Sequence, residues 1–337
     1  MHLITTSYHK QNCSGKTLDI ILSSWRDSTK KQYSCYLKRY SIFCEKNNFD
    51  PLDLNVNTVL TFLTELFEEN LSYSALNTAR SALSAIATDK NQTIGSHPII
   101  SRFMKGVYEL RTPQPKYQNI WDVSVLFNYF DSKETNEKLS MTDLTYKLCA
   151  LILLASAQRV QTLHKIQVKN IKFFDDKCEI LITEKLKHSK PGSPKTILKF
   201  ERFRDNDKLC VVLTLKEYLK RSENVRNKSD GLFLCLVKPY GCASKDTLAR
   251  WLKSVLIDAG INDFCSHSFR SASSTAMAKA GVAIEDILSS AGWSNAKTFR
   301  KFYDRSLIIS SEGKKKMTSS EVKKNDISNY FLKLPRS

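Results

Sequence analysis

The sequence lacks the motifs of several large enzyme classes and the long apolar runs of membrane proteins. It contains no G-x-x-x-x-G-K-[ST], G-x-G-x-x-G, H-E-x-x-H or G-x-S-x-G motif, so nucleotide hydrolysis, dinucleotide redox chemistry and zinc proteolysis lose support. No apolar run approaches the roughly 18 residues that a membrane helix needs. The first residues lack the basic-then-apolar pattern of a signal peptide. We therefore expect a soluble, intracellular protein with no membrane partner.

The nine cysteines lack the spacing of metal or disulfide sites. Their number is odd, they are spread along the chain, and no two form a C-x-x-C pair. This pattern indicates reduced thiols in a cytosolic or nuclear protein. We expect neither a zinc site nor a disulfide framework.

Acidic residues are scarce relative to basic ones. Asp and Glu number 34 against 52 Lys and Arg, which gives a formal net charge of +18. A surplus of this size favours a polyanionic partner, and nucleic acid is the commonest one.

The N-terminal third has the pattern of a helical domain. Residues 1–15 are polar and unpatterned, which predicts a flexible tail. Apolar residues recur at helical spacing through 16–112, with Ser72 as a candidate cap, and about four short helices are expected there. Two prolines separated by one residue then predict a stiff linker at 113–119.

The rest of the chain is assigned to a second domain at 120–306. Helical patterns at both of its ends enclose a short β segment, in which 179–183 and 196–200 flank a Pro-Gly turn. The predicted fold class is therefore mainly α with a small antiparallel β-sheet. Residues 307–337 are polar and lysine-rich, which predicts a basic, flexible tail whose apolar end (330–332) orders only when it docks.

Side chains suited to contacting phosphate occur in order along the second domain. Taken singly, each has an ordinary structural interpretation, such as a helix cap, a buried histidine or a core aromatic. Their coincidence in one order is what favours a shared function. They are Arg159, Lys185, Lys187, His267, Arg270, Trp293 and Tyr303.

This order closely resembles that of the tyrosine recombinases, the phage-integrase-like enzymes that break and rejoin DNA. The sequence of these motifs is most similar to that of recombinases of eukaryotic mobile elements of the Crypton and DIRS-like type. The resemblance covers roughly residues 20–306, and its strongest segments are 157–163, 186–192 and 267–303. One position departs from the family pattern, because Thr162 stands where an acidic residue commonly supports the first arginine.

The resemblance implies a site-specific DNA recombinase that needs no metal, ATP or other cofactor. Tyr303 is the expected nucleophile and forms a 3′-phosphotyrosyl intermediate. The other expected catalytic residues stabilise the phosphoryl charge or move protons, with Lys187 as the general acid and Lys185 as the alternative. They are Arg159, Lys187, His267, Arg270 and Trp293.

The expected partner is double-stranded DNA, held by basic side chains of both domains. In the family, two duplexes are held by a tetramer, so a homo-oligomer on DNA is implied. We expect the protein in the nucleus of a eukaryotic host, or in the cytoplasm if the host is prokaryotic. The candidate DNA-binding residues are Lys30, Lys31, Lys38, Arg39, Arg80, Lys185, Lys190, Lys245, Arg250 and Lys253, the last three on a helix expected after Ser244.

Two alternatives share most of these features. A domesticated, non-catalytic DNA-binding protein descended from a recombinase would keep the fold, but such a protein is expected to lose members of the catalytic set. A type IB topoisomerase shares the chemistry but relaxes a single duplex. The separate helical domain and the sequence around Trp293 argue against a topoisomerase.

Overall fold

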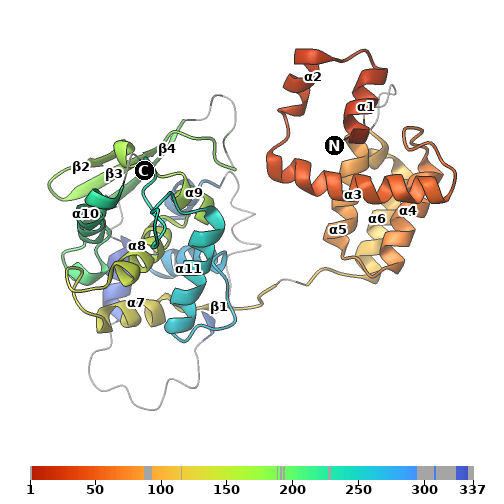
Figure 1. Cartoon of the computed structure of the whole chain (residues 1–337). Helices are drawn as coiled ribbons and strands as arrows, with labels where there is room; N and C mark the ends of the chain where they lie inside the picture. Colours follow the sequence, from red (N-terminus) through yellow and green to blue (C-terminus); the bar gives the residue numbers. More distant parts are fainter. Residues whose placement is uncertain are drawn as a thin grey trace. The chain divides into compact units, whose positions relative to one another are not determined.

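The computed structural model describes residues 2–86, 93–114, 116–187, 189, 192, 194–226, 229–293, 307–308 and 324–332, with the backbone alone at 307–308 and 324–327. The chain divides into two compact units, Met1–Lys116 and Tyr117–Ser337 (Figure 1). The division falls within the segment assigned as the linker. No described helix combines the length and the apolar character needed to cross a membrane.

The described part of the N-terminal unit is helical. Its elements are α1 (His2–Lys10), α2 (Gly15–Leu22), α3 (Asp27–Lys46), α4 (Val56–Glu68), α5 (Tyr73–Ser84), the 3-10 turn η1 (Ile94–Ser96) and α6 (Pro98–Leu110). Local sequence fixes several of their starts. The side chains of Asn55 and Ser72 accept hydrogen bonds from the first turns of α4 and α5, and Pro98 begins α6.

The core of this unit is apolar and aromatic. Helix α3 packs on α5, and α4 packs on both α5 and α6. The Phe62 ring lies at the centre, with its centroid 5.2 Å from that of Tyr40 and 5.4 Å from that of Phe43. No lysine or arginine among the described residues of this unit is buried in that core.

The prediction of a flexible tail at residues 1–15 is wrong for most of that segment. Residues His2–Lys10 form α1, and Ile4 is fully buried in the core of the N-terminal unit. Leu3 and Tyr8 pack against the same core. Ile4 and Tyr8 are four residues apart, so they share one face of a short amphipathic helix.

The C-terminal unit surrounds one apolar helix. Helix α8 (Met141–Ser156) is buried at nearly every position from Leu144 onward, and α9, α10, α11 and α12 all contact it (Figure 1). Its helices are α7 (Val123–Ser132), α8, α9 (Val160–His164), α10 (Val211–Ser222), α11 (Lys245–Asp258), α12 (Ser268–Lys279), α13 (Ile284–Ala291) and α15 (Lys324–Leu332), with the 3-10 turns η2 (Val168–Asn170), η3 (Asp207–Leu209) and η4 (Glu223–Val225).

Two small sheets complete this unit. Strands β2 (Ile171–Phe173), β3 (Lys177–Ile182) and β4 (Thr196–Glu201) form an antiparallel sheet with Ile180 opposite Leu198. Side chains alternate along β3, so that Cys178, Ile180 and Ile182 face the core. Strand β1 (Ile120–Trp121) pairs in parallel with β5 (Leu307–Ile308). The fold class predicted from the sequence, mainly α with a small antiparallel sheet, is confirmed.

The segment after residue 306 contains structure that the sequence did not predict. Besides β5, it forms α15, which packs on α12. Tyr330 and Phe331 are buried in the core of their own unit, and the Tyr330 ring centroid lies 4.8 Å from that of Phe127 and 5.0 Å from that of Phe203. The sequence predicts that the apolar end of this tail orders when it docks, and in the structure it docks on the core of its own unit.

Candidate active site

The C-terminal end of α8 leads to the first predicted arginine. The helix ends at Ala157, which is fully buried in the left-handed conformation (φ 49°, ψ 23°). A non-glycine residue in this conformation costs about 1 kcal/mol, so the surrounding contacts must hold it. Arg159 follows as the N-cap of α9 and is half-buried. Its guanidinium makes no hydrogen bond or ion pair with another described residue, which leaves it available to an anion.

The second predicted arginine reaches the same corner from α12. Arg270 lies in the first turn of α12 and is only 4% exposed. Its Nη1 donates a hydrogen bond of 2.9 Å to the carbonyl of Ala157, two residues before Arg159. His267, the N-cap residue of α12, is exposed. The structure thus brings together two arginines and a histidine that are far apart in the sequence.

The guanidinium of Arg270 also lies over the indole of Trp293. Its Cζ is 4.2 Å from the ring centroid, a cation–π contact. Helix α13 ends at Gly292, whose left-handed conformation (φ 66°, ψ 44°) glycine adopts without strain. The backbone N–H of Trp293 then donates to the Leu288 carbonyl. This turn fixes the position of Trp293 beside Arg270.

A buried polar network ties the same corner together, and the sequence did not predict it. The Gln158 side chain donates to the Ser290 carbonyl of α13 at 2.6 Å and accepts from the Thr162 hydroxyl at 3.0 Å. The Ser290 hydroxyl in turn donates to the Ser156 carbonyl. Thr162 therefore supports Gln158, at the position that is commonly acidic in the resembling family. The one available signal was a polar Gln158 directly between an apolar helix and Arg159.

The candidate general acids lie on the loop after β3. Lys185 and Lys187 are exposed, with buried Leu186 between them. Lys165, just after α9, forms an ion pair with Glu184 at the start of the loop. This pair links the loop to the end of α9, the helix that follows Arg159. No hydrogen bond or ion pair of the described residues joins Lys185 or Lys187 to that arginine.

Four of the six predicted catalytic residues therefore occupy adjoining positions: Arg159, His267, Arg270 and Trp293. Lys187 lies on a loop linked to this corner. Tyr303 and the candidate DNA contact Lys190 lie outside the described residues. The roles of all six residues stay predictions.

The candidate DNA-binding residues of the N-terminal unit lie on α3 and α5. Lys31 and Lys38 are exposed and seven residues apart, so they share one face of α3. Lys30 and Arg80 are half-buried, and Arg39 forms an ion pair with Glu69. The two exposed lysines of α3 are thus the most accessible charges of this set.

The other candidate DNA contacts lie on α11, which packs against α9. The Ser244 side chain caps α11 by accepting from the Thr247 N–H at 3.1 Å. Lys245, Arg250 and Lys253 are all exposed, and Lys245 lies 3.5 Å from Asp246. The helix therefore presents charge close to the element that begins with Arg159.

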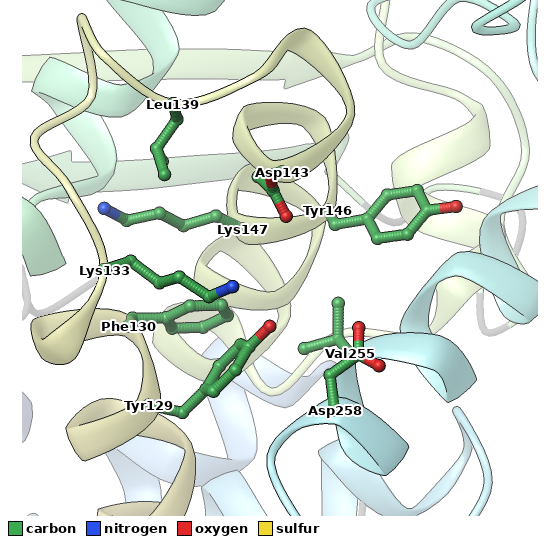
Figure 2. Close-up of a pocket in the computed structure, with 9 residues that line it drawn as sticks. All are labelled: Tyr129, Phe130, Lys133, Leu139, Asp143, Tyr146, Lys147, Val255 and Asp258. Atoms are coloured by element: carbon green, nitrogen blue, oxygen red, sulfur yellow. The ribbon is translucent and has the colours of Figure 1, made fainter.

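A pocket lies near the other end of α8, among α7, α8 and α11 (Figure 2). Its most unusual lining residue is Lys147, which is 1% exposed and donates to Asn136 Oδ1 at 2.9 Å. Asn136 donates onward to the Thr214 hydroxyl. Burial lowers the pKa of Lys147 from 10.5 to about 8. The pocket contains none of the predicted catalytic residues.

Comparison with known proteins places this fold among DNA-recombining enzymes. The Phage integrase family profile matches residues 126–307, more than half of the chain. The Tn1549 transposon integrase in complex with transposon right end DNA has a similar fold at 16% identity, with a TM-score of 0.56 over 89% of this chain and 94% of that one. No curated protein matches the sequence.

Two further solved structures share the fold. The XerH site-specific recombinase bound to palindromic difH substrate is 15% identical, with a TM-score of 0.54 over 74% of this chain and 69% of that one. The lambda integrase tetramer bound to a Holliday junction is 14% identical, with a TM-score of 0.50 over 90% of this chain and 78% of that one.

The fold and the site together define a helical recombinase domain that follows a separate helical unit. The chain belongs to the Phage integrase family, the tyrosine recombinases. It is accordingly a DNA strand-breaking and rejoining enzyme.

Proposed function

We propose that this recombinase cuts duplex DNA by attack of Tyr303 and rejoins it through a 3′-phosphotyrosyl intermediate. The observation that carries the proposal is the position of Arg270, between the Ala157 carbonyl and the Trp293 ring, beside the turn that leads to Arg159. Two guanidinium groups at one corner can donate paired hydrogen bonds to the oxygens of one phosphodiester. They keep their charge at any physiological pH.

In the proposed first step, the Tyr303 hydroxyl oxygen forms a bond to phosphorus while the bond from phosphorus to the 5′ oxygen breaks. The phenol proton passes to His267, and the leaving 5′ oxygen takes a proton from Lys187, or from Lys185 as the alternative. Negative charge that builds on the phosphoryl oxygens is stabilised by Arg159 and Arg270.

The second step reverses the first on a different DNA end. A 5′ hydroxyl attacks the phosphotyrosyl bond, and the phenol leaves with its proton restored. One phosphodiester is exchanged for another at each step, so the cycle needs no nucleotide hydrolysis. A cycle without nucleotide hydrolysis agrees with a sequence that has no phosphate-binding P-loop.

Recognition of the duplex is proposed to come from basic surfaces on both units. Lys31 and Lys38 of α3 supply charge from the N-terminal unit, and Arg250 and Lys253 of α11 supply it from the catalytic unit. Such contacts to backbone phosphates bind DNA without reading its sequence, and they weaken steeply as salt rises.

The biological setting is proposed to be a mobile element of the Crypton or DIRS-like type, with a tetramer acting on two duplexes. The residues around Arg159, Lys187 and Trp293 support this subtype, and a transposon integrase and a tetrameric integrase on a Holliday junction share the fold. A eukaryotic element of this kind would act in the nucleus, and a fluorescent fusion in a eukaryotic cell tests that location.

The proposal is tested by covalent trapping on nicked duplexes. Cleavage beside a nick releases a short fragment, and its loss prevents rejoining. The sequence around the nick is randomised so that the pool includes many candidate target sites. We expect wild-type protein to form a detergent-resistant adduct through a 3′ phosphate, while Tyr303→Phe binds the pool equally well and forms none.

An adduct in Tyr303→Phe would remove the nucleophile assignment. Sequence-selective binding by wild-type protein without any adduct, on duplexes enriched from the pool, would support the non-catalytic alternative instead.

A further inference from the structure

One buried residue of the catalytic unit contacts two elements, one before Tyr303 in the sequence and one after it. Trp121 lies in β1 and is 3% exposed. Its indole Nε1 donates a hydrogen bond of 2.8 Å to the Ser268 hydroxyl, the first residue of α12. Its backbone pairs with β5, where Ile308 is its register partner. The side chain thus holds α12, and the main chain holds β5.

The contact with α12 is specific and directional. The Ser268 hydroxyl donates its proton to the Cys265 carbonyl at 2.8 Å, so its oxygen is free to accept from the indole N–H. The Trp121 ring also packs edge-on against Phe269, with centroids 5.3 Å apart. Ser268 and Phe269 lie between His267 and Arg270. Trp121 therefore fixes the turn of α12 that carries His267, the proposed proton acceptor, and Arg270, a proposed phosphate ligand.

The contact with β5 bears on the nucleophile through chain length. Leu307, the first residue of β5, comes four residues after Tyr303 in the sequence, and four residues of chain extend about 14 Å at most. The other end of the same segment begins at Trp293, which is held under Arg270. The described residues on both sides of Tyr303 in the sequence are thus attached to α12. Trp293 contacts Arg270 directly, and β5 is attached through Trp121 of β1.

We propose that Trp121 is a positioning residue for the cleavage step, an inference that rests on the recombinase function proposed above. It couples the strand that follows Tyr303 to the turn that carries His267 and Arg270. Loss of this coupling lets Tyr303 move independently of His267 and Arg270, and a displacement of about 1 Å at a reacting centre can cost 100-fold in rate.

The test uses the full-length protein and one nicked duplex enriched in the trapping experiment. Trp121→Phe keeps an aromatic ring beside Phe269 but removes the indole donor, and Ser268→Ala removes the acceptor. The matched control is Trp251→Phe, which changes another buried tryptophan of the same unit, packed on Tyr146 of α8. The single-turnover rate of adduct formation at saturating protein, the DNA dissociation constant and the thermal midpoint are measured for each variant.

We expect Trp121→Phe and Ser268→Ala each to lower the cleavage rate by roughly 10-fold without weakening DNA binding. The double variant should be no slower than the slower single variant, because both changes break the same bond. Trp251→Phe should stay within about twofold of wild type. If Trp121→Phe is unfolded at the assay temperature, Ser268→Ala, which removes one oxygen atom, decides the matter.

Wild-type cleavage rates in Trp121→Phe and Ser268→Ala would overturn the inference and leave the proposed function intact. Losses that multiply in the double variant, or an equal loss in Trp251→Phe, would also overturn it, since they indicate independent or general packing effects. Absence of an adduct in wild-type protein would remove the proposed function itself.

Discussion

The two units bury polar groups very differently. In the described part of the N-terminal unit, the buried polar side chains are Ser7 and Thr58, together with the hydroxyl of Tyr40, and no charged side chain is buried. The catalytic unit buries Gln158, Arg270 and a run of serines and threonines along α12, as well as Lys147. Burying such groups is costly unless each finds a partner.

This difference indicates where chemistry takes place. A unit that only has to hold a DNA backbone can place its cations in water and keep an apolar core. A unit that stabilises charge during a reaction must hold the groups that do so in place. The Ala157 carbonyl holds the Arg270 guanidinium, and the Gln158–Ser290 bond holds the residue next to Arg159. Predictions for four cations test this distinction: Arg270 and Lys147 in the catalytic unit, and the pair Lys31 and Lys38 on α3.

The largest effect is expected at Arg270. Arg270→Lys keeps the positive charge but loses the planar guanidinium that donates to the Ala157 carbonyl, lies over Trp293 and is proposed to bind the phosphate. We expect the single-turnover cleavage rate to fall on the order of 1,000-fold, while DNA affinity changes little.

Arg226→Lys is the matched control for this change. Arg226 also donates to backbone carbonyls, those of Gly231 and Leu232, in the same unit. Its replacement should lower the thermal midpoint without slowing cleavage at a temperature where the protein is folded. Equal losses of rate in the two variants would indicate that Arg270 is a structural arginine.

The second effect concerns the buried cation at the other end of α8. Because burial lowers the pKa of Lys147 to about 8, folding at lower pH forces this side chain either to stay charged in the core or to give up its proton. The unfolded chain keeps its proton up to about pH 10.5. The charged Lys147 therefore lowers the free energy of unfolding below pH 8, and this free energy rises as the pH increases from 8 to 10.5.

Lys147→Met removes this titration. Relative to the variant, the free energy of unfolding of wild type should rise by about 3 kcal/mol across that window. Urea unfolding followed by tryptophan fluorescence reports mainly the catalytic unit, which holds Trp121, Trp251 and Trp293. A difference between the two proteins that stays constant with pH would show that Lys147 keeps an ordinary pKa.

The smallest effect is expected for the surface cations of the N-terminal unit. Lys31→Gln combined with Lys38→Gln should weaken DNA binding several-fold and make the slope of log affinity against log salt shallower by about 1.8. The cleavage rate at saturating protein should not change. Lys10→Gln, which alters a lysine 3.8 Å from the Asp50 carboxylate, serves as the control. An unchanged salt slope in the double variant would show that Lys31 and Lys38 do not contact the DNA phosphates.

Much of the fold could be predicted because the signals are local. The apolar residues of α8, the Ser72 and Ser244 caps and the alternating residues of β3 and β4 all lie within a few residues of the element that they define. Helix α1 was missed because nine residues carry only a short apolar face. The β1–β5 pairing was missed because two-residue strands far apart in sequence have no period to detect.

The site was predicted only in part for the same physical reason. Arg159, His267, Arg270 and Trp293 could be selected by residue type and order. The contacts that hold them could not, because the Gln158–Ser290 and Trp121–Ser268 bonds join residues more than a hundred positions apart. The burial of Lys147 depends equally on which helices surround α8.

Identifying the residue that is covalently bound to DNA tests the proposed cleavage chemistry. Adduct formed on a nicked duplex is digested with protease and nuclease, and the peptide that carries the residual nucleotide is sequenced by mass spectrometry. We expect a nucleotide joined through its 3′ phosphate to Tyr303. A link to any other residue, or through a 5′ phosphate, would contradict it.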